Sequence, residues 1–91
     1  MAGTFADNSA QGRFELTEDG HMAFANYSIA DGRMLIPYVE AAMALRGTGA
    51  ASRLMAHVAG EARARQLKVV PLCGYASSWF RRHPDQRDLL D

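Results

Sequence analysis

Alternation of apolar and polar residues predicts strands in the first half of the chain. Residues 13–16 alternate as a half-buried strand does, and residues 21–30 alternate again after the turn at Glu18-Asp-Gly20. Asp31-Gly32 favours a two-residue hairpin, because both central positions of a type I′ turn need positive φ. A further strand runs from residue 33 toward residue 40. We therefore predict an antiparallel meander of three strands.

The second half of the chain changes to helical spacing. From residue 51 onward the apolar residues recur on one helix face, at Leu54, Met55, Val58, Ala59 and Ala62. Residues 68–73 have the pattern of a buried strand, Gly74 interrupts it, and residues 75–82 suit a short helix that stops at His83-Pro84. The predicted order is three strands, a loop, a helix, a strand and a helix.

Three segments lack a decisive pattern. Residues 1–11 are small and polar, so we expect them to be partly flexible, with residues 4–6 able to add a short edge strand. Residues 40–45 are good helix formers that follow Pro37, and periodicity does not decide between helix and strand. Residues 85–91 form a polar tail that two leucines anchor.

Size and composition narrow the class of protein. The 91 residues, 48% of them hydrophobic, suit one domain over residues 1–91. No apolar run approaches the length of a membrane span and the first residues lack a signal-peptide pattern, so we expect a cytoplasmic protein. One cysteine, Cys73, and three scattered histidines do not make a metal site.

The charges are balanced overall but divided along the chain. Ten Lys and Arg against ten Asp and Glu argue against a nucleic-acid or anionic-membrane partner. Residues 1–45 carry two basic and six acidic groups, a net −4, and residues 46–91 carry eight basic and four acidic groups, a net +4. An anionic ligand therefore belongs in the second half, although a dipolar surface without a ligand has the same charges.

A glycine-rich loop, Arg46-Gly-Thr-Gly-Ala-Ala-Ser52, leads into the predicted helix. Its glycines permit a tight turn, and the first turn of a helix leaves N–H groups unpaired, which suits phosphate or pyrophosphate. A Walker A loop would need a lysine here. A dinucleotide fingerprint would need a third glycine at Ser52 and an acidic residue near Cys73. A plain connection remains the alternative.

The spacing of Arg46, Gly49 and Ala51 resembles the coenzyme A pyrophosphate loop of the GNAT N-acetyltransferase superfamily. The likeness to its minimal single-domain subfamily extends from about residue 7 to residue 90. The other matching segments include Asp7-Asn8, Arg13-Phe-Glu-Leu16, Ala44-Leu-Arg-Gly47, Leu67-Lys-Val-Val-Pro-Leu-Cys73, Tyr75 and Arg81-Arg-His-Pro84.

The resemblance implies an α+β fold, in which the antiparallel meander is followed by an α-β-α unit. It makes residues 34–41 a strand and residues 42–45 the exit from that strand. This strand and the strand at residues 68–73 would splay apart to hold the thioester of acetyl-CoA. The implied activity is transfer of the acetyl group from acetyl-CoA to a primary amine, by a monomer or weak homodimer. Trp79 and Phe80, if exposed, would be candidates for a contact with a second copy.

The family pattern also implies which residues form the site. Ala41 would pair with the pantetheine arm, Arg82 would reach the ribose phosphate, and the pyrophosphate would meet the loop residues Arg46, Gly47, Thr48, Gly49, Ala50, Ala51 and Ser52. Three residues are candidates for catalysis: Glu40 as the base, Tyr75 as the acid for the departing thiolate, and Cys73 as a nucleophile or a wall of the pocket. Each has a structural alternative, as a surface charge, a packing residue and a buried thiol.

Two other functions remain open from the sequence. The strand end reads Tyr38-Val-Glu-Ala-Ala42, whereas the family often has His-Thr-Glu-Val-Pro, and only Glu40 is kept. That change favours a coenzyme A-binding module with weak or no catalysis, acting as a sensor or a partner-binding domain. A small interaction domain without a ligand is the third possibility.

Overall fold

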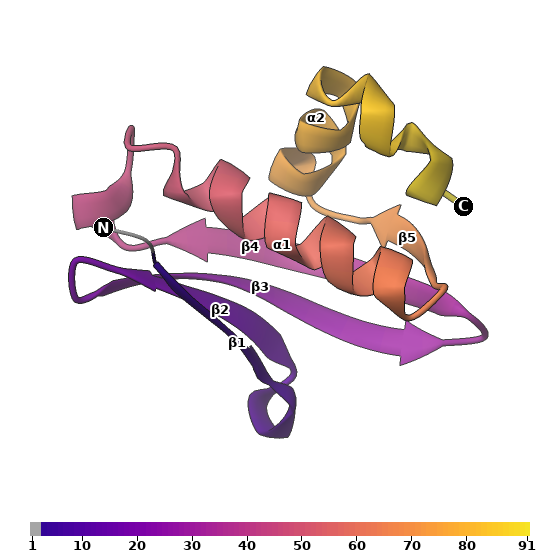
Figure 1. Cartoon of the computed structure of the whole chain (residues 1–91), viewed down its shortest axis with the longest axis horizontal. Helices are drawn as coiled ribbons and strands as arrows, with labels where there is room; N and C mark the ends of the chain where they lie inside the picture. The colour runs from indigo at the N-terminus through magenta and orange to yellow at the C-terminus, as the bar shows by residue number, and fades with distance from the viewer. Residues whose placement is uncertain (1–2) are drawn as a thin grey trace.

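A five-stranded sheet with two helices forms the fold of residues 3–91, the part that the computed structural model describes (Figure 1). The strands lie in chain order, and all neighbours are antiparallel except β4 and β5, which are parallel. They are β1 (Thr4–Asn8), β2 (Arg13–Glu18), β3 (His21–Ala30), β4 (Arg33–Ala41) and β5 (Lys68–Pro71). The helices are α1 (Ala50–Ala64) and α2 (Gly74–Arg82), with short 3-10 helices η1 (Ser9–Gln11), η2 (Met43–Leu45) and η3 (Pro84–Leu89).

The predicted meander is confirmed as β2, β3 and β4. The segment expected to be flexible carries strand β1, which pairs with β2 over Thr4–Asn8 and is two residues longer than the short edge strand expected there. Residues 1 and 2 lie outside the described part of the chain. The ambiguous segment at residues 40–45 is the end of β4 followed by η2, as the resemblance implied.

A β-bulge interrupts β4 at Pro37, a residue that is unfavourable inside a central strand. Asn26 pairs with Tyr38 and Ser28 with Leu35, so one residue of β3 lies opposite both Ile36 and Pro37. Proline has no N–H to donate, and a bulge is where a central strand tolerates that loss. The extra residue reverses the alternation of β4 beyond this point.

The core lies between the sheet and α1. The helix contributes Leu54, Met55, Val58, Ala59 and Ala62, all fully buried. Strands β2 and β4 contribute the large side chains of Phe14, Leu16, Met34 and Ile36. Strand β3, which lies between them, contributes the small side chains of Ala23 and Ala25. The small residues of β3 allow the helix to approach the centre of the sheet closely.

Three details differ from the sequence prediction. Strand β5 ends at Pro71, two residues earlier than expected, because the N–H groups of Leu72 and Cys73 both donate to Ile36 O and the chain turns there. Helix α2 begins at Gly74 rather than after it. Trp79 and Phe80 are both 1% exposed, so neither is a surface contact for a second copy. Within residues 3–91 no helix is long and apolar enough to cross a membrane.

Candidate functional site

A cavity of about 240 Å³ lies where the end of β4, the glycine-rich loop and the first turns of α1 and α2 meet. Its lining residues are Ala41, Leu45, Arg46, Gly47, Gly49, Ala50, Ala51, Ser52 and Tyr75. The structure therefore brings together most of the residues predicted to hold a phosphate ligand, and adds the predicted acid. Leu45 is the one lining residue that the sequence did not single out. It is an ordinary core residue by type and is 4% exposed.

The backbone of the loop has a shape that only glycine adopts easily. Gly47 has φ 79° and Gly49 has φ 87°, both in the left-handed region. Gly49 is also the N-cap of α1 and has no side chain with which to cap the helix. A Cβ at Gly47 would meet no atom within 4 Å, so the space above this glycine is open. The loop thus exposes its backbone to the cavity.

Several backbone donors of the loop are available to a ligand. Within residues 3–91 no hydrogen bond engages the N–H groups of Gly47, Gly49, Ala51 and Ser52. Thr48 acts differently, because its hydroxyl donates to Leu45 O over 2.5 Å and accepts from the N–H of Ala50 over 3.3 Å. Unpaired N–H groups at a helix start, with the positive end of the helix dipole, form a site for an anion.

Arginine and tyrosine side chains border this anion site. Arg46 donates from Nε to Ala41 O over 3.5 Å, a long bond that a ligand can replace. The guanidinium of Arg82 lies 5.9 Å from the centre of the Tyr75 ring. Burial raises the pKa of Tyr75, and the nearby Arg82 offsets only part of that change. Tyr75 therefore stays protonated at neutral pH and has a proton to donate.

One edge of β4 is free next to the cavity. The register with β5 ends at Ile36 opposite Pro71, whereas β4 continues to Ala41. Ala42 N donates to Met22 O, so alternate residues of β4 face β3 and the backbone groups of Val39 and Ala41 face the open side. An extended ligand can add to this edge as a further strand does.

The two remaining catalytic candidates, Cys73 and Glu40, do not line the cavity. Cys73 is the N-cap of α2, and its Sγ accepts from the N–H of Ala76 over 3.4 Å. Its own N–H donates to Ile36 O over 3.3 Å, which places Cys73 where β4 and β5 separate. The thiol is half-buried.

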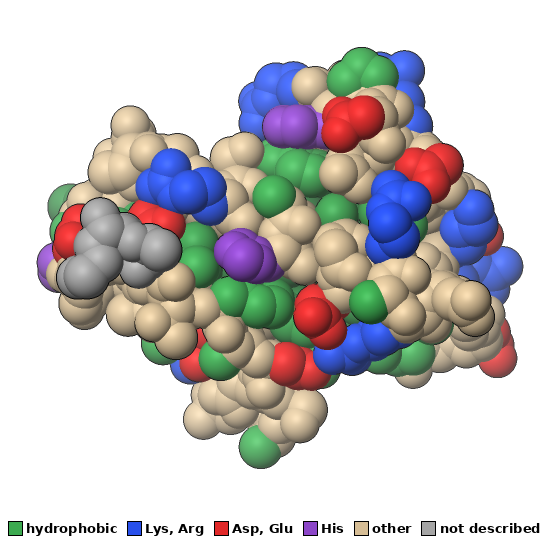
Figure 2. All heavy atoms as spheres, in the orientation of Figure 1, with side chains coloured by type: hydrophobic (Ala, Val, Ile, Leu, Met, Phe, Trp, Pro, Cys, Tyr) green, Lys and Arg blue, Asp and Glu red, His purple; other side chains and the backbone are tan. Residues whose placement is uncertain are grey.

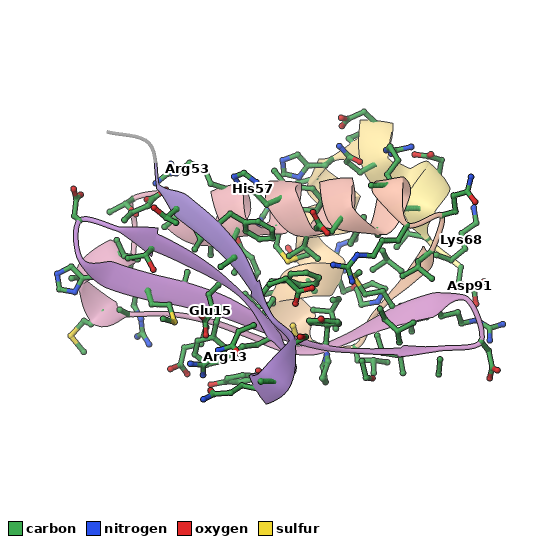
Figure 3. All side chains as sticks on the ribbon, turned by 60° about the horizontal axis from the view of Figure 1, so that its bottom comes forward. Arg13, Glu15, Arg53, His57, Lys68 and Asp91 are labelled. Atoms are coloured by element: carbon green, nitrogen blue, oxygen red, sulfur yellow. The ribbon has the colours of Figure 1, made fainter. Side chains whose placement is uncertain are left out.

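Glu40 lies on the face of the sheet opposite α1. Glu40 pairs with Phe24 of β3, and Phe24 pairs in turn with Glu15 of β2, so these three side chains share one face of the sheet. Figure 3 labels Glu15 and Arg13, which mark the side of the sheet away from α1. The Glu40 carboxylate accepts a hydrogen bond from the hydroxyl of Tyr38. Tyr38 and Glu40 share a face because they are two residues apart in a strand, and the bulge places that face on the outside of the sheet.

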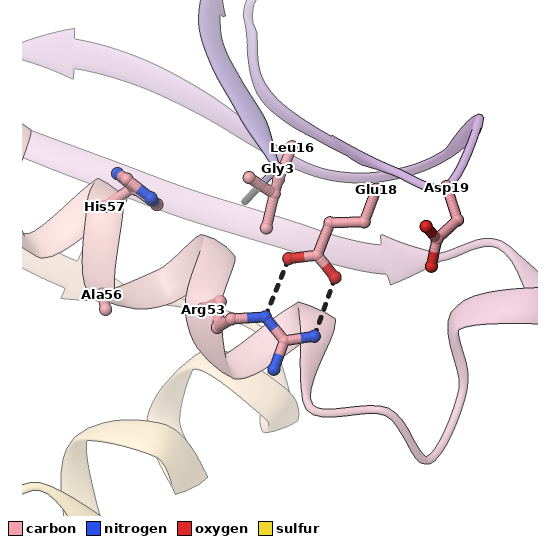
Figure 4. A pocket seen from close by; sticks show the side chains of 7 residues that line it. All are labelled: Gly3, Leu16, Glu18, Asp19, Arg53, Ala56 and His57. Carbon is pink, nitrogen blue, oxygen red and sulfur yellow. Dashed lines mark hydrogen bonds and ion pairs between the residues drawn. The ribbon is translucent and has the colours of Figure 1, made fainter. Parts of the chain in front are cut away.

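A larger cavity, of about 630 Å³, lies elsewhere between β2 and α1 (Figure 4). Its charged groups already bind one another, because Arg53 donates from Nε and Nη2 to the two carboxylate oxygens of Glu18, each over 2.7 Å. None of the residues predicted for the site lines this cavity. Most of the residues predicted for the phosphate site line the smaller cavity instead.

The basic residues of the second half are divided between structural pairs and free groups. Figure 2 shows many of them over the C-terminal elements, with acidic side chains between them. Arg63 pairs with Asp88, and Arg65 pairs with Asp7 and Glu61. Among the described residues, Arg46 and Arg82 take part in no ion pair with a carboxylate. The free positive charge near the cavity suits an anionic ligand, and within residues 3–91 no group of His, Cys, Asp or Glu is arranged to hold a metal ion.

Comparisons with known proteins address the family and the fold of the chain. Residues 13–89 match the family model described as GCN5-related N-acetyl-transferase. A solution structure of a GCN5-like protein from Staphylococcus aureus has a TM-score of 0.71 over 97% of this chain and 87% of that one. At 18% sequence identity, this likeness shows the shared fold alone. A search of curated proteins finds no significant match.

Proposed function

The chain belongs to the GCN5-related N-acetyl-transferase family, and on that basis we propose that it binds acetyl-CoA and transfers the acetyl group to a primary amine. The observation that carries the proposal is the cavity that joins the glycine-rich loop, the free edge of β4 and Tyr75. These are the three parts that a ligand with a pyrophosphate, an extended arm and a thioester requires. The fit of this chain to acetyl-CoA rests on these residues.

The loop supplies the pyrophosphate site in this proposal. The N–H groups of Gly47, Gly49, Ala51 and Ser52 donate to the phosphate oxygens, and Arg46 adds a positive charge beside them. Larger residues at the two glycines would force the backbone out of its left-handed conformation. Arg82 extends from α2 beside Tyr75 and is placed to meet a further phosphate.

The free edge of β4 holds the pantetheine arm. Val39 and Ala41 offer alternating donors and acceptors along the open side, and the amide groups of the arm have the matching pattern. This places the thioester near the point where β4 and β5 separate, beside Cys73. Acetyl-CoA supplies an activated acetyl group there.

Protons must move at two places during the transfer. We assign Glu40 to take a proton from the acceptor ammonium, which would approach from the face of the sheet opposite α1. The amine nitrogen then bonds to the carbonyl carbon, the carbon–sulfur bond breaks, and the nitrogen releases its second proton to water to give the neutral amide. Tyr75, kept protonated by burial, donates its proton to the departing sulfur. Cys73 would form the wall of the reaction site, or accept the acetyl group first as a nucleophile.

One observation favours the alternative of a coenzyme A-binding module. Neither Glu40 nor Cys73 lines the cavity, and the Glu40 carboxylate is bonded to Tyr38. A domain that only binds the coenzyme would need the loop, the strand edge and Tyr75, and nothing on the outer face. The two functions therefore share the same binding site and differ only in turnover.

Calorimetric titration with acetyl-CoA tests the binding site. Ala51→Glu places a carboxylate in the first turn of α1, where the helix dipole tolerates it but phosphates are repelled, and we expect at least a tenfold loss of affinity. Ala64→Glu adds the same charge at the far end of α1 and is the control. No binding by the folded wild type would overturn both functions.

Turnover separates the enzyme from the binding module. Wild-type protein, acetyl-CoA and a panel of primary amines are followed by release of free thiol. We expect Glu40→Gln to lower the rate by about a hundredfold with unchanged acetyl-CoA affinity. Cys73→Ala would abolish turnover for a nucleophile and change it only slightly for a pocket wall. Binding without turnover on any amine would favour the module.

A further inference from the structure

A partly buried hydrogen bond joins the second helix to the predicted phosphate site. The indole Nε1–H of Trp79 donates to Ser52 Oγ over 3.0 Å, between α2 and the first turn of α1. Trp79 is 1% exposed, and Ser52 lines the cavity beside the glycine-rich loop. Two residues 27 positions apart in the chain thus meet at the edge of the site.

The chemistry of the two groups fixes the direction of this bond. An indole N–H only donates, so Ser52 must accept from it. The hydroxyl of Ser52 then keeps its own hydrogen for another partner, and within residues 3–91 no acceptor receives that hydrogen. An ionised phosphate oxygen can accept hydrogen bonds but has none to donate, so it needs a donor such as this hydroxyl. The indole therefore presents Ser52 to the cavity as a donor, which is the role that an anion requires.

The indole is itself held in place on two sides. The ring of His83 stacks on it with the ring centres 4.1 Å apart, and His83 Nδ1 lies 2.7 Å from Trp79 O. The ring of Phe80 meets the indole edge-on at 5.1 Å. Because the Ser52 side chain has few other partners, an indole that is held in one position also holds the Ser52 hydroxyl in one position.

We propose that Trp79 is a positioning residue for the phosphate site, and that it acts by orienting the Ser52 hydroxyl to donate a hydrogen bond to the pyrophosphate of the ligand. The inference rests on the proposed function, since it concerns the same cavity. It adds a residue of α2, outside the loop motif, to the determinants of coenzyme affinity. Packing of α2 and binding of the coenzyme are then coupled through one hydrogen bond.

A double-mutant cycle tests this coupling. Dissociation constants for coenzyme A are measured by calorimetry for wild type, Ser52→Ala, Trp79→Phe and the double variant. Ser52→Ala removes a hydrogen bond to a charged pyrophosphate, so we expect it to lower the affinity for coenzyme A about tenfold. Trp79→Phe should cost about threefold in the wild-type background and nothing further once Ser52 is alanine. Ser52→Thr, which keeps the hydroxyl, should bind nearly as the wild type.

Two controls separate positioning from general loosening. Leu16→Val shortens a buried side chain of β2 and leaves the indole and its bond in place, so it should lower the unfolding midpoint and leave coenzyme affinity unchanged. Pantetheine, which lacks the pyrophosphate, should bind Trp79→Phe as well as it binds the wild type. Equal losses from Trp79→Phe with and without Ser52, or a loss for pantetheine as well, would overturn the inference.

Trp79 is the only tryptophan of the chain, which gives a readout that needs no substitution at Trp79. Its indole N–H resonance should shift when coenzyme A binds, since the Ser52 hydroxyl strengthens one bond as it forms the other. In Ser52→Ala the shift on binding should be lost. An unchanged resonance in a wild type that binds coenzyme A would contradict the inference and leave the proposed function standing. A wild type that does not bind coenzyme A would overturn both.

Discussion

Tyr27 donates its hydroxyl hydrogen to Asp7 Oδ1 over 2.6 Å, and this bond joins β3 to β1 across the intervening strand. The other oxygen of the same carboxylate accepts from Arg65 Nη2 over 2.7 Å, at the end of α1. A single side chain of the edge strand thereby adds bonds to β3 and to the end of α1, beyond the backbone pairing of β1 with β2.

Removing the hydroxyl should loosen this attachment. We expect Tyr27→Phe to lower the free energy of unfolding by about 1 kcal/mol, since the Asp7 carboxylate keeps only its arginine partner. Urea unfolding followed by circular dichroism measures the change. Asp31→Asn, in an exposed turn whose positive φ asparagine accepts, is the control and should change little. Equal effects of the two substitutions would contradict a structural role for the bond.

Acid should weaken the same attachment. Burial alone would raise the pKa of Asp7, but the hydrogen bonds from Tyr27 and Arg65 outweigh it and the pKa is lowered below 3.8. A hydrogen bond from Arg63 likewise lowers the pKa of Asp88. A group with a lower pKa in the folded protein adds stability above its unfolded pKa, and this is lost as the pH falls through the folded value.

We therefore expect the unfolding free energy to fall below about pH 4, and to fall less steeply in Asp7→Asn than in the wild type. Urea midpoints measured from pH 7 down to the acid limit test this. The two curves should converge as the pH falls. Parallel curves over the whole range would show that the Asp7 carboxylate does not carry this part of the pH dependence.

Much of the fold follows from local sequence, and the exceptions have a common cause. The alternation in β2 and β3 predicted those strands because each buries one face of the sheet. In β4 the inward-facing residues are Met34 and Ile36, which are buried, and then, after the bulge, Val39 and Ala41, which are partly buried. No single period describes that set, so the pattern alone did not settle where the strand ended.

The candidate site likewise has features that the sequence predicts and features that only the fold reveals. The glycines of the loop were visible because a left-handed backbone has a sequence signature. The hydrogen bond between Trp79 and Ser52 was not visible, because it depends on the packing of two helices and leaves no local pattern. Tyr38 and Glu40 share a face by their spacing of two, but which face of the sheet they share depends on the bulge. Contacts between distant segments require the fold before they can be inferred.

The bulge predicts that the chain tolerates a deletion at Pro37 better than a deletion in a regular strand. Deleting Pro37 removes the extra residue, so the alternation of β4 becomes regular and Val39 and Ala41 still face the core. Deleting Glu15 from β2, whose pairing with β3 has no bulge, would turn one of the two buried residues of β2 to the outer face. We expect the deletion in β2 to lower the free energy of unfolding several-fold more, measured by thermal unfolding. Similar costs for the two deletions would show that the bulge does not decide which residues of β4 face the core.

Two glycines of the α1 region should respond in opposite directions to alanine. Gly49 has φ 87°, and a Cβ there would lie 3.0 Å from Arg53 Nη1, so Gly49→Ala should destabilise the protein by about 1–2 kcal/mol. Gly60 is within α1 and a Cβ there would meet no atom within 4 Å, so Gly60→Ala should stabilise it by about 0.5–1 kcal/mol. Urea unfolding of both variants measures the two signs. A stabilising Gly49→Ala would show that the loop does not need the left-handed backbone on which the phosphate site is built.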